Sequence, residues 1–187
     1  MIPLQKGVSS DLIGVASTTS MDRDEEKMSE KALNMMVDDI KTVGVNLFGN
    51  HEHNWENTLG VIKEAELKDN QVHIGITLDD ANTNPKVPMM MNKLKKGIKL
   101  GLSVGGTVTK DRFEYSKELG KRIRVLDEVK IYEVSVVGIP SNSDSFMSIP
   151  SAISKSHKGL NLYNSKLCPC CYDTMKGEQC KTCLYKH

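Results

Sequence analysis

Residues 99–108, KLGLSVGGTV, place one serine in a short apolar run with a glycine two positions away on either side. In a β-strand, alternation puts Gly101, Ser103 and Gly105 on one face and leaves the leucine and the valine on the other. A strand seldom has two glycines on one face, because glycine packs nothing there, and the common reason is that another group approaches the backbone. Ser103 is therefore a candidate nucleophile, and Gly105 and Gly106 are candidate oxyanion donors through their backbone N–H groups.

Two histidines could supply the base that a serine hydroxyl needs at neutral pH, because imidazole titrates in the right range. His51 and His53 follow the apolar segment NLFG and the Gly49–Asn50 turn. If this segment stays extended, alternation points both rings the same way, so spacing does not separate them. Both are candidates for the base.

A carboxylate in the strand EVKIYEVSVV is the third unusual feature. Regular alternation places Glu133 on one face with Val129, Ile131 and Ser135. An unpaired charge on such a face is costly, so Glu133 needs a partner. Imidazole would serve, and Ser103, a histidine and Glu133 would then form a nucleophile, a base and an orienting group. The alternative is a cross-strand ion pair with one of the nearby cations, Lys130, Arg122 or Arg124.

The composition of the chain argues against nucleic-acid binding by the main domain and against membrane insertion. The chain has 187 residues, 39% hydrophobic and 26% charged, with a net charge of +1, which argues against a large nucleic-acid footprint on the main domain. No apolar stretch approaches the roughly 20 residues that span a bilayer. Neither a membrane contact nor a secretion signal is expected, and a reducing cytoplasm is the default compartment.

The order of elements predicts an α+β, mainly β domain over residues 1–150, a polar linker over 151–166 and a cysteine module over 167–187. Helices are predicted over 29–40, where Ser29 can cap an apolar stripe, and over about 86–97. Strands are predicted in the segments DLIGVAST, TVGVNLFGN, TLGVIKEAEL and NQVHIGITL and in two β-rich runs after residue 99. The charge run DRDEEK is predicted to be a solvated loop.

Four segments in this order resemble the prohead (head maturation) serine proteases of tailed bacteriophages, distant relatives of the herpesvirus assemblins. They are GVASTTSMDRDEEKMSEKAL, FGNHEHNWENTLGVIKEAEL, LKKGIKLGLSVGG and EVKIYEVSVVGIPSNSDSFM, and they span about residues 10–150. The resemblance implies a herpesvirus-protease-like closed β-barrel flanked by helices. It also implies a homo-oligomeric endopeptidase that cuts the scaffold, or the scaffold segment of the major capsid protein, and itself. This would take place inside the immature procapsid in the host cytoplasm.

The resemblance also assigns roles to residues. The family nucleophile maps to Ser103, and the acidic member of the triad, in the E-V-S-V strand, maps to Glu133. The family histidine follows the early strand directly, which favours His51 and keeps His53 as the alternative base. In the herpesvirus branch a second histidine takes the third role. No cofactor is implied for catalysis.

All five cysteines lie between residues 168 and 183. Two C-x-x-C pairs, Cys168 with Cys171 and Cys180 with Cys183, are typical of a structural Zn²⁺ site, and Cys170 could replace Cys171. A module of this size buries no core, so the metal would supply its folding energy. The sequence thus predicts a small zinc-ribbon-like module; the alternative is a thiol-rich tail or a redox pair.

Two rival functions are also compatible with the sequence. One is a non-enzymatic capsid-assembly or scaffold-binding protein that works through the zinc tail. The other is a metal hydrolase that uses His51, His53 and Glu56, although no helical H-E-x-x-H motif is present.

Overall fold

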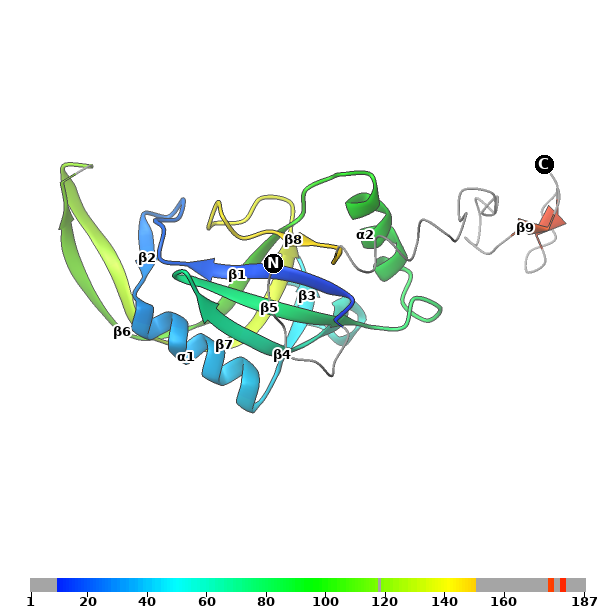
Figure 1. The fold of residues 1–187 in the computed structure, drawn as a ribbon, viewed down its shortest axis with the longest axis horizontal. Coiled ribbons are helices and arrows are strands. Elements are labelled where there is room, and N and C mark those ends of the chain that lie inside the picture. Colours follow the sequence, from blue (N-terminus) through cyan, green and yellow to red (C-terminus); the bar gives the residue numbers. More distant parts are fainter. Residues whose placement is uncertain (1–9, 118, 151–174, 177–178, 181–187) are drawn as a thin grey trace. The chain divides into compact units, whose positions relative to one another are not determined.

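The computed structural model describes residues 10–117, 119–150, 175–176 and 179–180 (Figure 1). The chain divides into two compact units, Met1–Ile149 and Pro150–His187. No helix within the described ranges is long and apolar enough to cross a membrane.

In the second unit, residues 175–176 and 179–180 are described as the short strands β9 (Met175–Lys176) and β10 (Gln179–Cys180), which pair antiparallel. The predicted linker over 151–166 lies outside the described residues. So do Cys168, Cys171 and Cys183, three of the four predicted zinc ligands.

Two helices form where the apolar spacing predicts them. Helix α1 (Glu30–Thr42) begins after Ser29, whose side chain accepts a hydrogen bond from the Ala32 backbone N–H at 3.2 Å. Its buried side chains fall on one stripe: Ala32, Leu33, Met36, Val37 and Ile40. Helix α2 (Lys86–Lys95) buries Val87 and Met90.

The described residues of the first unit form eight strands: β1 (Leu12–Thr18), β2 (Glu26–Met28), β3 (Val45–Gly49), β4 (Thr58–Lys68), β5 (Gln71–Leu78), β6 (Gly101–Ser116), β7 (Lys121–Val137) and β8 (Met147–Ser148), with a 3₁₀ turn at Trp55–Asn57. The six longer strands lie in the segments predicted to be strands. The loop prediction for the charge run is wrong at β2, which pairs parallel with β7 from Arg124 to Leu126. This pairing depends on a distant strand, which local composition does not reveal.

The strands form one curled sheet in the order β2-β7-β3-β4-β5-β1-β8, with β6 paired to β7. The sheet is a half-barrel instead of the fully closed barrel that the resemblance implies. Among the residues that the structure describes, a single bridge, between Gly101 and Phe146, joins the start of β6 to the segment before β8. There the Leu102 backbone N–H donates to the Ser145 carbonyl at 3.0 Å. The mainly β fold with two helices is confirmed.

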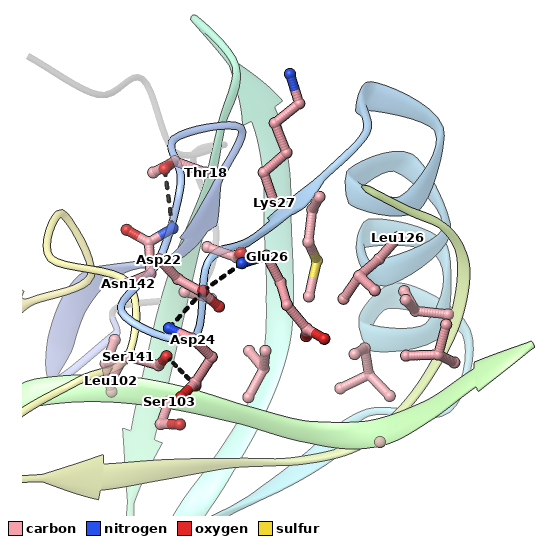
Figure 2. A pocket seen from close by; sticks show the side chains of 18 of the residues that line it. Thr18, Asp22, Asp24, Glu26, Lys27, Leu102, Ser103, Leu126, Ser141 and Asn142 are labelled. Atoms are coloured by element: carbon pink, nitrogen blue, oxygen red, sulfur yellow. Dashed lines mark hydrogen bonds between the residues drawn. The ribbon is translucent and has the colours of Figure 1, made fainter. Parts of the chain in front are cut away.

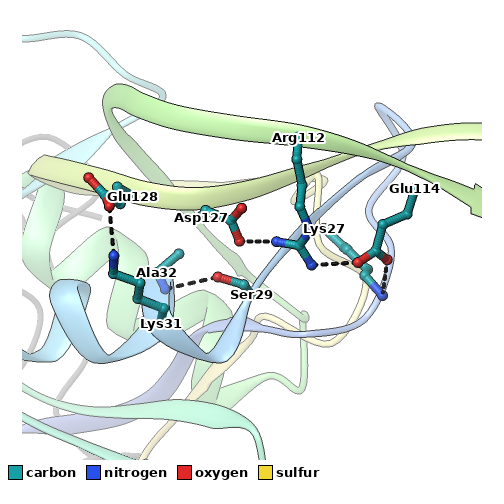
Figure 3. A network of polar contacts seen from close by, with 8 residues as sticks. All are labelled: Lys27, Ser29, Lys31, Ala32, Arg112, Glu114, Asp127 and Glu128. Carbon is teal, nitrogen blue, oxygen red and sulfur yellow. Dashed lines mark hydrogen bonds and ion pairs between the residues drawn. The ribbon is translucent and has the colours of Figure 1, made fainter.

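The long β6–β7 hairpin extends beyond the rest of the sheet (Figure 1). Within the hairpin, Arg112 binds Asp127 and Glu114. Two further ion pairs connect the hairpin to neighbouring elements: Lys27 of β2 lies 3.6 Å from Glu114, and Lys31 of α1 lies 2.6 Å from Glu128 (Figure 3). Exposed pairs of this kind contribute little to stability. The backbone pairing of β6 with β7, which includes three register shifts, sets the register on which the site depends.

Candidate active site

Strand β7 lies between β3 and β6 and brings the candidate residues together. In the antiparallel β6–β7 pair, Ser103 is opposite Ser135 and Gly105 is opposite Glu133. Directly opposite residues share a face, so Ser103 and Glu133 lie on the same side of the sheet. A Cβ on Gly105 would lie only 2.2 Å from Oε1 of Glu133. The group that needs this bare backbone is therefore the Glu133 carboxylate.

A β-bulge in β7 corrects the predicted neighbours of Glu133. The register shifts where Gly105 pairs with Glu133 and Gly106 pairs with Ile131, so that Tyr132 is an extra residue on β7. Because a bulge resets alternation, Ile131 turns into the core while Glu133 stays on the face of Ser103. Val129 is also in the core, and the prediction that Glu133 shares its face with these two residues is wrong.

A tight turn after β3 positions the first histidine. Asn50 and His51 have φ values of 55° and 59°, in the left-handed region that few non-glycine residues adopt. Strand β7 holds this turn: the Asn50 backbone N–H donates to the Val136 carbonyl at 2.9 Å, and the His51 backbone N–H donates to Oγ of Ser135 at 3.2 Å. The conformation of the turn thus depends on a strand more than 80 positions away in the chain.

The Glu133 carboxylate lies at the centre of a polar cluster. Its Oε1 lies 2.5 Å from Nδ1 of His51 and 3.1 Å from Nε2 of His53. Its Oε2 accepts a hydrogen bond of 2.5 Å from the Ser135 hydroxyl. Glu133 is only 3% exposed, so these contacts replace the water that it loses on folding.

The alternative ion pairs for Glu133 are not formed. Lys130 lies 2.5 Å from Asp39, Arg124 binds Glu26 and Asp111, and the Arg122 guanidinium lies over the ring of Phe113. Each cation near Glu133 in sequence thus has another partner, and the histidines take the carboxylate.

Two opposing effects set the ionisation of Glu133. Burial by itself raises the pKa of the Glu133 carboxyl, whereas hydrogen bonds from Ser135, His51 and His53 lower it. The net effect holds the pKa of Glu133 below its usual value, so the group is an anion at neutral pH. An anionic carboxylate only accepts hydrogen bonds, so His51 donates through Nδ1–H, and in a neutral imidazole the acceptor nitrogen is then Nε2.

The two histidines differ in their relation to a cleft of about 310 Å³. Ser103 and His51 both line this cleft, whereas His53 is not among its lining residues. His53 is more exposed, at 59% of its side chain against 39% for His51, and its ring packs at a tilt against Phe48.

The walls of the cleft come from two loops and a group of core side chains (Figure 2). The loop that carries Asp24 lies over Ser103, and it is joined to the loop after β7 by the Ser141 hydroxyl, which donates to Asp24 at 2.6 Å. Asn142 donates to Thr18 at 2.9 Å. The apolar side of the cleft is formed by Met28, Val108, Leu126, Val129 and Ile131.

Ser103 and His51 share the cleft, but the described residues include no hydrogen bond between the Ser103 hydroxyl and either histidine. Catalytic hydrogen bonds of this kind are commonly long in substrate-free enzymes and shorten when substrate binds. The pairing of the nucleophile strand with the carboxylate strand is already in place.

The same cluster is the group among the described residues that could hold a metal ion. Ligand atoms of His51, His53 and Glu133 lie within 4.8 Å of one another. Glu56, the acid of the predicted metal-hydrolase alternative, is not in this group.

Ser135 belongs to the site, although the sequence reasoning assigned it no role. It is fully buried and contacts both the carboxylate and the histidine turn. Its position two residues after Glu133 in a strand was the available signal, because such residues share a face.

Replacing Gly105 with alanine is expected to lower kcat/KM about 100-fold, because the new Cβ displaces the Glu133 carboxylate and a shift of about 1 Å in a catalytic group has an effect of that size. Steady-state peptide hydrolysis measures the loss. Gly138→Ala is the matched control, since a Cβ there meets nothing within 4 Å. Equal activities for the two variants would contradict this account of Gly105.

Comparison with known proteins concerns the family and the fold of this chain. A model of the caudovirus prohead serine protease family matches residues 13–159. Among solved structures, the bacteriophage T4 capsid assembly protease gp21 is similar, with a TM-score of 0.50 and 16% identity over 67% of this chain and 79% of that chain. At this identity the likeness shows a common fold. A search of curated proteins found no match. Because the family model covers well over half of the sequence, the chain belongs to the caudovirus prohead serine proteases.

Proposed function

We propose that this serine protease is the head maturation endopeptidase of its phage, with Ser103 as nucleophile, His51 as base and Glu133 as the group that orients the base. Its substrates are the scaffold protein or the scaffold segment of the major capsid protein, and its own chain. The observation that carries this proposal is the 2.5 Å contact between the buried Glu133 carboxylate and Nδ1 of His51, beside a cleft that both His51 and Ser103 line.

The chemistry follows from these positions. The Ser103 hydroxyl attacks the scissile carbonyl while Nε2 of His51 takes its proton. The tetrahedral intermediate collapses when the same nitrogen gives that proton to the leaving amine, and an acyl-enzyme remains. Water, activated by His51, then releases the second product and regenerates the serine. Glu133 stays ionised throughout and stabilises the imidazolium that forms in each half.

An extended peptide fits the free edge of β6. The Leu102 N–H points away from β7, toward the Ser145 carbonyl, so alternation directs the N–H groups of Val104 and Gly106 to the same edge. Both residues line the cleft, and a substrate strand could pair with them there. Of the two predicted oxyanion donors, Gly106 therefore has its N–H on the substrate side, whereas that of Gly105 is directed at β7.

The remaining expectations are part of the same proposal. The enzyme acts as a homo-oligomer inside the immature procapsid in the host cytoplasm, and its main domain contacts neither membrane nor nucleic acid. Cys168, Cys171, Cys180 and Cys183 offer four thiolates, a donor set that fits tetrahedral Zn²⁺. This metal would have a structural role outside the chemistry.

Co-expression with the scaffold and major capsid proteins tests the proposed function. We expect defined fragments of one or both by intact mass when the wild-type chain is present and none when it is omitted. A fluorophosphonate should add its mass to the peptide that contains Ser103. Intact scaffold and capsid proteins in the presence of the wild-type chain, together with an unlabelled Ser103, would contradict the proposal.

Metal removal separates this mechanism from a metal hydrolase built on His51, His53 and Glu133. After EDTA treatment and desalting, we expect kcat/KM for a peptide substrate to remain within about twofold of the untreated enzyme, because His51 acts as a free base. A metal-hydrolase mechanism predicts instead that EDTA abolishes activity and that added Zn²⁺ restores it. Restoration of activity by Zn²⁺ would contradict the serine mechanism and support the metal-hydrolase mechanism.

A further inference from the structure

A buried hydroxyl links the carboxylate and the histidine turn of the site. Ser135 has no exposed surface, and its Oγ takes part in two hydrogen bonds. It donates to Oε2 of Glu133 at 2.5 Å and accepts from the His51 backbone N–H at 3.2 Å. The reaction described above uses no atom of this side chain.

We propose that Ser135 is a positioning residue, whose hydroxyl fixes the Glu133 carboxylate and the His51 backbone in the one arrangement that directs Nε2 of His51 toward Ser103. This inference rests on the proposed function of the site.

The first argument is the division of the two carboxylate oxygens. Oε1 contacts both histidine side chains. Contacts on this one oxygen do not fix the plane of the carboxylate. Oε2 accepts a hydrogen bond from the Ser135 hydroxyl. With a contact on each oxygen, the carboxylate of Glu133 cannot rotate about the last torsion of the side chain. Without this contact, Glu133 could turn toward His53 and leave His51 without its orienting partner.

The second argument is the backbone of the turn. His51 has a left-handed conformation, which costs energy for a residue other than glycine and persists only where neighbours hold it. Ser135 accepts the His51 N–H from across the sheet, in addition to the Asn50 contact with Val136. One side chain thus restrains both ends of the Glu133–His51 hydrogen bond.

The third argument is the chemistry of the side chain. A position between a carboxylate and an N–H must donate to one and accept from the other, and a hydroxyl does both. Alanine would leave Oε2 and the N–H without partners in a buried site. Threonine keeps the hydroxyl and suits a strand.

The test compares Ser135→Ala and Ser135→Thr with the wild-type chain on a peptide substrate. For Ser135→Ala we expect kcat to fall about 10- to 100-fold with KM within about twofold, because a hydrogen bond to a charged group is lost without a change in substrate contacts. Threonine should restore most of the loss. Ser10→Ala is the matched control, since Ser10 is also buried and donates to a carboxylate, that of Glu64, at 2.9 Å. Its kcat should not change.

A double-variant experiment separates positioning from a general effect on folding. In a Glu133→Ala background, adding Ser135→Ala should change the rate of fluorophosphonate labelling of Ser103 less than about twofold. Ser135 acts through Glu133, and the effects of substitutions at residues that act as a unit do not add. If Ser135→Ala does not fold, Ser135→Cys keeps the shape with a weaker donor and should lower kcat at least about fivefold.

Three outcomes would overturn the inference. The first is a wild-type kcat in Ser135→Ala, or in Ser135→Cys if Ser135→Ala does not fold. The second is an equal loss on adding Ser135→Ala to the wild-type chain and to Glu133→Ala, and the third is a loss of kcat in Ser10→Ala equal to that in Ser135→Ala. An active wild-type enzyme with any of these leaves the proposed function intact and removes only the role of Ser135. An inactive wild-type chain with no labelling of Ser103 removes both.

Discussion

Peptide hydrolysis should fall by about 10⁴- to 10⁶-fold when Ser103 is replaced with alanine, because the hydroxyl is the only group that forms the covalent intermediate. Ser103 lies on β6 at the cleft, opposite Ser135 in the β6–β7 strand pair, and makes no side-chain hydrogen bond with either histidine of the described site. Removing its Oγ therefore disturbs little else. The expected variant is folded, with unchanged melting temperature, and inactive toward both peptide and co-expressed capsid substrates.

Thr109→Ala is the matched control for Ser103→Ala. It removes a hydroxyl from the same strand, where Thr109 donates to the Glu128 carbonyl and does not line the cleft. Its activity should stay within about twofold of wild type, as for most surface substitutions. Full cleavage of the scaffold or capsid protein by Ser103→Ala would exclude Ser103 as the nucleophile.

Replacing His51 with alanine should also lower kcat/KM by about 10⁴-fold or more, whereas His53→Ala should lower it only about tenfold. The geometry gives the reason. His51 offers Nδ1 to Glu133 and lines the cleft, so that Nε2 is available to Ser103. His53 offers Nε2 to the same oxygen at 3.1 Å and lies outside the lining, so its loss removes one of three polar side-chain contacts with the carboxylate.

The two histidine variants control for each other, because each removes an exposed imidazole and one contact with Glu133. Fluorophosphonate labelling of Ser103 gives a second measurement, since it reports activation of the nucleophile without turnover. A larger loss for His53→Ala than for His51→Ala would make His53 the base and reverse the two roles.

Much of the fold follows from local pattern in the sequence. The apolar stripe after Ser29 is sufficient for α1, because helical spacing of apolar side chains determines which face is buried. The alternating segments likewise give β4 and β5. Strand β2 does not follow from local pattern, since it exists only by pairing with β7.

Residue types in the sequence also determined the candidates for the site. Ser103 was marked by its glycines, Glu133 by a charge inside an apolar strand, and the histidines by their place after β3. The sequence could not separate His51 from His53, because both rings have the same spacing relation to the strand.

Tertiary structure alone decided how these residues meet. The bulge at Tyr132 turns Glu133 away from Val129 and Ile131, and the turn at Asn50 presents different nitrogens of the two histidines to one carboxylate oxygen. Both features depend on the register between strands that are distant in sequence, and a shift of one residue in register moves a side chain to the opposite face. Local composition therefore named the chemical groups of this site, and the strand pairing of β3, β6 and β7 determined their geometry.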